Sequence, residues 1–166
     1  MGPKLPELVE VGHALRDVIN DLNPRALDET GFVPAIQWYA NSLAENFPCR
    51  VMAPEEPIFL APLAANELLS VCRDIIGGLF LPGGAAEASI ELELSEATLR
   101  VHLRAGKKNE GVVPVNAESL EKWGIPERMM CLEGFAEVTP EADTSLLITL
   151  SLPVTRQAAV LAMRAA

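Results

Sequence analysis

The sequence has few basic residues, few histidines and few cysteines, and each shortage argues against a class of protein. Only 13 lysines and arginines stand against 23 aspartates and glutamates, which gives a net charge of −10. A protein that neutralises nucleic-acid phosphates normally needs the opposite sign, so we expect no direct contact with DNA or RNA. Two histidines and no Cys-x-x-Cys pair argue against a zinc site. The three cysteines, Cys49, Cys72 and Cys131, are odd in number and far apart, which predicts reduced thiols in the cytosol.

Long apolar runs are also missing. No stretch approaches about 18 uninterrupted apolar residues, so the sequence predicts no membrane span. The start of the chain, Met1 to Pro6, lacks the basic residues and apolar run of a signal peptide. Hydrophobic residues nevertheless make up 49% of the 166 residues, and charged residues 22%, which suits a packed core. We therefore expect a cytoplasmic protein with one domain, or one domain plus a helical arm.

The first part of the chain predicts a helix over residues 5–22 with a narrow apolar seam. Its members recur three and four residues apart: Leu5, Leu8, Gly12, Leu15, Ile19 and Leu22. This spacing is typical of a coiled coil, with one weak position at Gly12. A seam this short is not stable alone, so it predicts contact with a partner helix or packing on its own domain. Asn23-Pro24 ends the helix, because proline disfavours the helical conformation in the residue before it.

The remaining pattern alternates helices and strands. Helices are predicted over 31–46, 60–80 and 117–133, the last interrupted near Gly124, and a short one over 155–165. Strands are predicted over 50–52, 89–94, 98–104, 135–139 and 146–152. Alternating apolar residues, with acids on one strand and bases on the next, mark 89–94 and 98–104 as a hairpin. The order predicts an α+β fold: a two-layer sandwich of a mixed, mostly antiparallel sheet covered by helices on one face.

One segment makes the sequence recognisable. The run from Leu22 to Phe32 reads Leu-Asn-Pro-Arg-Ala-Leu-Asp-Glu-Thr-Gly-Phe. It resembles the end of the dimerisation bundle in sensor histidine kinases of the nitrate-sensor type, where Leu-Arg-Pro-x-x-Leu-Asp-x-x-Gly-Leu is usual. The closing Leu150-Ser151-Leu152-Pro153 is similar to the last strand of that family. The resemblance spans residues 8–154 and implies the ATPase fold that these kinases share with gyrase, Hsp90 and MutL.

The resemblance also implies a division of the chain. Residues 1–30 are expected to be a helical arm like the end of a dimerisation bundle, and residues 31–154 the ATPase domain. Residues 155–166 are expected to be a helical extension. The family works as dimers with response regulators, so the resemblance implies a homodimer or mixed dimer through the seam. It also implies a protein partner that is either a histidine kinase or a response regulator.

The nucleotide-binding positions depart from the family pattern. In active relatives the core helix carries a Glu and, four residues on, an Asn that holds Mg²⁺; here Asp74 and Gly78 stand at these positions. The Asp of the family's Asp-x-Gly-x-Gly box, which binds adenine, is replaced by Ala105, and its first Gly by Lys107. Glycine offers no side-chain ligand to Mg²⁺, which requires hard oxygen ligands. We therefore expect no cofactor. ATP and Mg²⁺ would bind only if the chain is an ATP-binding fragment or subunit of a kinase.

Of the two histidines, only His13 is a candidate phosphoacceptor, and its context is unfavourable. His13 is followed by Ala14, whereas a phosphoacceptor histidine usually has an acid directly after it. His102 alternates with arginines on one strand face, which indicates a structural or solvent-facing role.

Three functions remain open from the sequence. The first is a degenerate kinase-like domain, a non-catalytic regulatory or interaction module in two-component signalling. The second is an ATP-binding catalytic fragment or subunit of a sensor histidine kinase. The third is a histidine phosphotransfer protein that uses His13. The lost nucleotide boxes favour the first, and with it a protein that is not an enzyme.

Overall fold

The computed structural model describes residues 31–106, 115–141 and 145–154. The predicted arm, with its seam residues Leu5, Leu8, Leu15, Ile19 and Leu22, lies outside the described residues, and so do His13 and the predicted helix at 155–165. Among the described residues, no helix is both long and apolar enough to cross a membrane.

Five strands form one sheet in the order β1-β2-β3-β5-β4. Their bounds are Cys49–Met52 for β1, Glu87–Ser95 for β2, Thr98–Gly106 for β3, Phe135–Pro140 for β4 and Leu146–Pro153 for β5. Strand β1 runs parallel to β2, and every other neighbouring pair is antiparallel. The sheet is therefore mixed and mostly antiparallel, as the sequence predicts.

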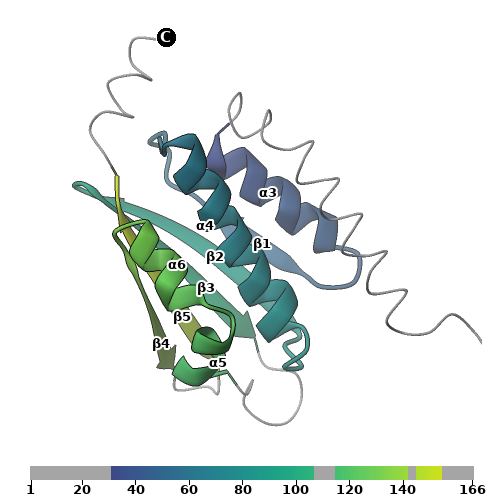
Figure 1. Cartoon of the computed structure of the whole chain (residues 1–166). Coiled ribbons are helices and arrows are strands. Elements are labelled where there is room, and N and C mark those ends of the chain that lie inside the picture. The colour runs from purple at the N-terminus through teal and green to yellow at the C-terminus, as the bar shows by residue number, and fades with distance from the viewer. Residues whose placement is uncertain (1–30, 107–114, 142–144, 155–166) are drawn as a thin grey trace, which may run out of the picture.

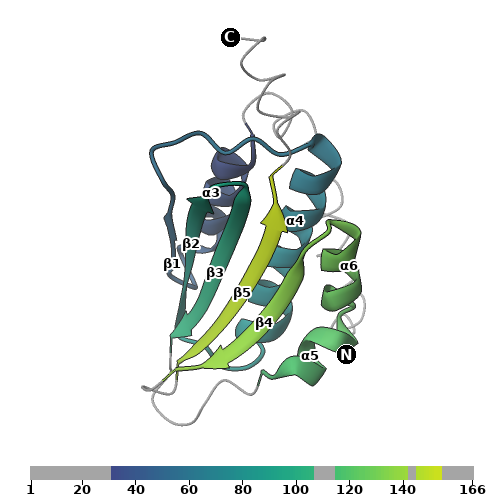
Figure 2. The same cartoon turned by 90° about the vertical axis from the view of Figure 1, so that its left-hand side faces the viewer.

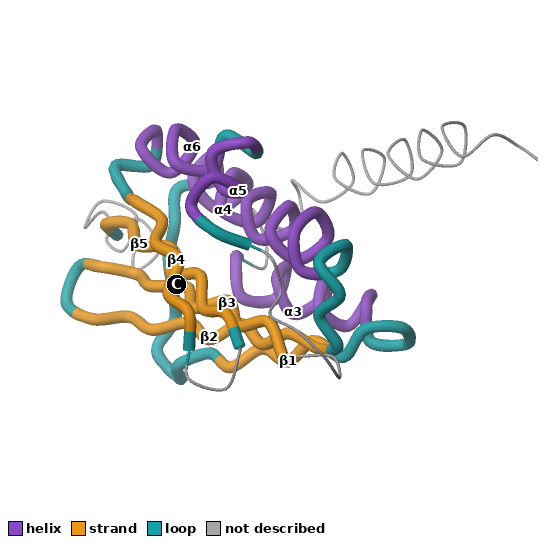
Figure 3. The backbone as a smooth tube through the Cα atoms, turned by 90° about the horizontal axis from the view of Figure 1, so that it is seen from below, coloured by secondary structure: helices purple, strands orange, loops and turns teal. Residues whose placement is uncertain are grey.

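The helices lie together on one face of this sheet (Figure 1). They are α3 (Phe32–Leu43), α4 (Pro62–Asp74), α5 (Ala117–Lys122) and α6 (Ile125–Cys131). Helix α4 continues without a break into a π-helical segment, η1 (Ile75–Phe80). Seen along the layers, the helices form one side and the strands the other (Figure 3). The opposite face of the sheet carries no described helix, and Figure 2 looks at the strands from that side.

The core lies between the sheet and the helices. Alternate residues of β3 are buried, so that Leu99, Val101 and Leu103 face the helices while Arg100 and Arg104 do not. Ile148 and Leu150 of β5 continue the same buried surface, and Leu68 of α4 packs in the same core cluster. This period of two is what the sequence pattern predicts for a sheet with one covered face.

The structure confirms the fold class and refines two of the predicted helices. The helix expected at 60–80 begins at Pro62 and changes to π-helical geometry at Ile75. The helix expected at 117–133 is divided into α5 and α6 by Gly124, whose φ of 65° lies in the left-handed region that glycine adopts at little cost.

Candidate functional site

The side of α4 that carries Asp74 is covered by one arginine. Arg128 of α6 donates from Nε to Glu67 Oε1 (2.5 Å) and from Nη1 to Asp74 Oδ2 (2.6 Å). Its Nη2 donates to Ser70 Oγ at 2.8 Å. The three acceptors are three and four residues apart, so they lie on one side of the helix. We call this set of four residues the Arg128 clamp.

The clamp is partly withdrawn from solvent, which affects its charge. The Arg128 side chain is only 24% exposed. Burial disfavours its positive charge, but the hydrogen bonds with Glu67 and Asp74 outweigh burial and raise the pKa of Arg128 above its ordinary value. The guanidinium therefore stays charged and donates one hydrogen bond to each carboxylate. One oxygen of Asp74, Oδ2, is thus bonded to a cation of the chain itself.

One turn beyond Asp74, a tryptophan lies where a side chain of residue 78 would be. A Cβ built on Gly78 would lie 2.5 Å from two carbons of the Trp123 ring. Any other residue here would have to displace the ring, since real Cβ atoms do not approach so closely. The neighbouring Gly77 has more room, because the atom nearest to a Cβ built there is the Tyr39 hydroxyl oxygen, at 3.5 Å. The absence of a side chain at position 78 is thus what lets Trp123 pack against η1.

Local sequence signals hold Trp123 and Arg128 in place. Asn116 caps α5: its Oδ1 accepts from the Ser119 N–H at 3.0 Å, and Ser119 Oγ accepts from the Asn116 N–H at 3.2 Å. This reciprocal capping box fixes the start of the segment. Gly124, with a left-handed φ of 65°, then separates α5 from α6 directly after Trp123. The short helices α5 and α6 therefore present the indole and the guanidinium to the same long helix.

Ala105, the third of the expected nucleotide positions, lies on the sheet. Ala105 is fully buried in β3, between Ala88 of β2 and Leu146 of β5. A methyl group among apolar neighbours offers no hydrogen bond to a ligand. The fourth position, Lys107, lies outside the described residues. The structure thus places Asp74 and Gly78 on one continuous helix and Ala105 on the inner face of the sheet, with apolar or internally bonded surroundings at each.

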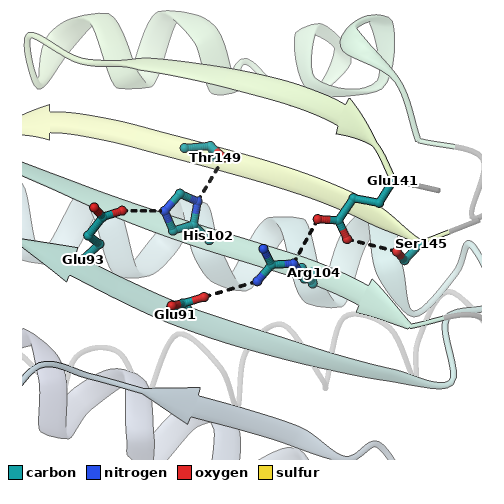
Figure 4. Close-up of polar contacts among 7 residues, drawn as sticks. All are labelled: Glu91, Glu93, His102, Arg104, Glu141, Ser145 and Thr149. Atoms are coloured by element: carbon teal, nitrogen blue, oxygen red, sulfur yellow. Dashed lines mark hydrogen bonds and ion pairs between the residues drawn. The ribbon is translucent and has the colours of Figure 1, made fainter. Parts of the chain in front are cut away.

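A second polar cluster lies on the uncovered face of the sheet (Figure 4). His102 lies between two partners, with Nε2 3.1 Å from Glu93 Oε2 and Nδ1 3.2 Å from Thr149 Oγ1. Because a carboxylate only accepts, a neutral ring must carry its proton on Nε2, and Nδ1 then accepts from the Thr149 hydroxyl. These bonds connect β2, β3 and β5.

The same cluster continues through Arg104 (Figure 4). Its Nη1 donates to Glu91 (3.2 Å) and its Nε to Glu141 (3.1 Å), and Glu141 also accepts from the Ser145 hydroxyl at 3.0 Å. The hydrogen bond with Glu141 is the largest reason that the pKa of Arg104 is raised, with burial acting in the opposite direction. The charges on this face compensate one another across neighbouring strands, so we assign the cluster to cross-strand stabilisation.

The comparisons with known proteins agree on the architecture. Neither a protein-family model nor a curated protein matches the sequence. Among solved structures, a blue-light activated histidine kinase of Erythrobacter litoralis matches with a TM-score of 0.57 and 11% identity, over 74% of this chain and 41% of that one. The histidine kinase AdeS of Acinetobacter baumannii matches with a TM-score of 0.54 and 9% identity, over 93% of this chain and 87% of that one. The catalytic domain of histidine kinase ThkA gives 0.54 at 8% identity, over 75% and 92%.

The chain has the fold of a histidine-kinase ATPase domain. Identities this low show the fold alone, and the chain spans less than half the length of the Erythrobacter kinase. The resemblance led us to expect nucleotide-binding positions at Asp74, Gly78 and Ala105. Gly78 supplies no oxygen, Asp74 is bonded to Arg128, and Ala105 is an apolar group in the core. No group of three or more His, Cys, Asp or Glu residues that could hold a metal occurs within the described ranges.

Arg128 and Trp123 were not singled out by the sequence. Glu67, Ser70 and Asp74 are three and four residues apart, which places them on one side of the helix but does not reveal a partner. The identity of that partner depends on how the chain returns to α4 more than 50 residues later, which a single sequence does not reveal.

Proposed function

We propose that the chain is a non-catalytic module of two-component signalling, which keeps the histidine-kinase fold and does not use ATP. The observation that carries this proposal is the closed surface over α4 and η1. There Trp123 packs where the side chain of residue 78 would be, and Arg128 bonds the carboxylate of Asp74. The likeness to three histidine kinases supports the signalling context.

Electrostatics supports the same proposal. A triphosphate that approaches a carboxylate needs a metal ion between them, because like charges repel. Here a guanidinium from the chain itself already bonds the carboxylates of α4, at distances of 2.5 and 2.6 Å. The segment that precedes Gly124 also carries Glu118 and Glu121, where the resemblance implies a glycine-rich lid over the phosphates, and acids here would repel a triphosphate.

A module of this kind would act through its surface and its helical arm. Under the proposal, the seam of Leu5, Leu8, Leu15, Ile19 and Leu22 pairs with the same seam of a second copy or of a genuine histidine kinase. A mixed dimer would hold one catalytic and one inert domain, and so lower the activity of its partner. Replacing Leu15 and Ile19 with serine should lower the oligomeric mass in light scattering, and an unchanged mass would remove the seam from the proposal.

Calorimetric titration with ATP, with and without Mg²⁺, tests the central claim. We expect no heat of binding up to millimolar ATP, and no rise in melting temperature with MgATP. A ligand at about 100 times its Kd would stabilise the fold by roughly 2.7 kcal/mol, so the absence of a shift is informative. Mg²⁺-dependent binding tighter than about 100 μM, or about 5.5 kcal/mol, would return the chain to the ATP-binding class.

A double variant distinguishes two reasons for a lack of ATP binding. The nucleotide site could be covered by side chains, or it could lack the oxygen ligands that Mg²⁺ needs. Trp123→Ala with Arg128→Ser should open the surface over α4 and still leave no oxygen ligand at Gly78. We expect this double variant to bind no MgATP either. If it binds MgATP while the unaltered chain does not, the site is blocked rather than lost, and the proposal of a decayed site is wrong.

A further inference from the structure

One end of the domain combines exposed apolar and acidic residues. The end of β5 and the start of α4 lie at this end in both side views (Figures 1 and 2). The turn between β2 and β3 is there too, because the Val154 N–H donates to the carbonyl of Ala97 at 2.8 Å. The chain therefore leaves the described structure after Val154 at the same end of the domain as the start of α4.

The surface at this end has an unusual composition. Leu63, in the first turn of α4, is 85% exposed, and Phe59 in the segment before it is 37% exposed. A single exposed leucine needs no explanation, but a second large apolar residue is exposed four positions earlier in the chain. Glu55 and Glu56 are exposed in the same segment, and the sequence has no lysine or arginine between Val51 and Cys72. We call Glu55, Glu56, Phe59 and Leu63 the α4-end surface.

The sequence that follows Val154 complements this surface in charge and in apolar character. Residues 155–166 contain Arg156 and Arg164 and no acid, and they include Val160, Leu161 and Met163. The segment spans roughly 18 Å if it is helical and more if it is extended, enough to cross one end of a domain of this size. Apolar residues can thus cover Phe59 and Leu63 while the arginines approach Glu55 and Glu56.

We propose that residues 155–166 dock in cis on the α4-end surface. Burial of the two apolar side chains supplies the main driving force, and the opposite charges fix the orientation. The N-terminal segment, which also lies outside the described structure, suits this surface less well. Residues 1–22 carry four acids and two bases, so the acidic segment at Glu55 and Glu56 would repel them.

Limited proteolysis of the full chain tests the proposal, since trypsin cleaves after Arg156 and Arg164. Docking must open before the protease can act, so the cleavage rate follows the open fraction. We expect Leu63→Ser to accelerate cleavage at both arginines by about tenfold, which corresponds to about 1.4 kcal/mol. Met130→Ser is the matched control, because Met130 is 71% exposed but lies on α6, and its cleavage rate should equal that of the unaltered chain.

Two further measurements make the outcome decisive. Glu55→Gln with Glu56→Gln should accelerate cleavage severalfold, and added salt should reduce the difference from the unaltered chain. Leu63 is exposed, so the variant should keep the melting temperature of the core, which circular dichroism checks. Equal cleavage rates for Leu63→Ser and the unaltered chain would refute docking on this surface. Protection that grows with protein concentration would also refute it, because the segment would then dock on a second copy.

Discussion

Replacing Arg128 with methionine should destabilise the domain by about 2 kcal/mol. The change removes three hydrogen bonds, two of them to carboxylates, and leaves Glu67 and Asp74 on one side of α4 without their shared cation. Hydrogen bonds to charged groups are worth roughly 1.5–3 kcal/mol each when protected from water. Glu67 and Asp74 are 39% and 34% exposed, so water screens part of this energy and recovers part of the loss. Methionine keeps most of the apolar stem, which limits the loss of packing.

The assay is urea denaturation followed by circular dichroism, with a thermal melt beside it. A loss of about 2 kcal/mol corresponds to a fall in melting temperature of about 4–8 °C for a domain of this size. Lys122→Met is the matched control, because Lys122 pairs with Glu118 at 3.7 Å, with both side chains 72% exposed. An exposed pair of this kind contributes well under about 1 kcal/mol. If Arg128→Met costs no more than Lys122→Met, the clamp does not form in solution and the closed surface loses its main support.

Three further predictions test other parts of the structure. Gly78→Ala should destabilise the domain by about 1–3 kcal/mol, because the new methyl group meets the Trp123 ring. Gly77→Ala should be neutral or stabilising by up to about 1 kcal/mol, since a Cβ has room there. Equal effects of the two variants in urea denaturation would contradict the packing of Trp123. Burial raises the pKa of Cys72 to about 12 and that of Cys49 to about 11, so the unfolded chain loses these protons first, and stability should fall as the pH rises from about 9 toward 12. Cys72→Ala should flatten this decline in melts recorded between pH 8 and 11, and an unchanged slope would show that other groups cause it. Asn116→Ala should cost about 1 kcal/mol through loss of the capping box, while an unaffected melting temperature would indicate that the cap does not hold α5.

The sheet was the part of the fold that the sequence specified best. Strands β2 and β3 alternate apolar and charged residues, and the period of two places Val101 on one face of the sheet and Arg104 on the other. The acid–base match between the two strands is present as the pairs Glu93–Arg100 and Glu91–Arg104. Local periodicity was sufficient here because these neighbouring strands are also neighbours in the sequence.

The closed surface over α4 could not be predicted in the same way. The resemblance to histidine kinases drew attention to Asp74 and Gly78, but not to the residues that would pack against them. What fills the space depends on the return of α5 and α6 across the sequence, which brings Trp123 to Gly78 and Arg128 to Asp74. Contacts between residues so far apart leave no local signature in one sequence.

The order of strands in the sheet also governs how the chain folds. Strands β2 and β3 form a hairpin joined by a short turn, so their pairing closes early and at little entropic cost. The pairing of β3 with β5 closes a loop that contains α5, α6 and β4, so we expect it to form later than the hairpin. Because the Arg128 clamp lies in that late segment, its loss should mainly accelerate unfolding and leave the refolding rate nearly unchanged. The lifetime of the native state, more than its rate of formation, would then depend on this one arginine.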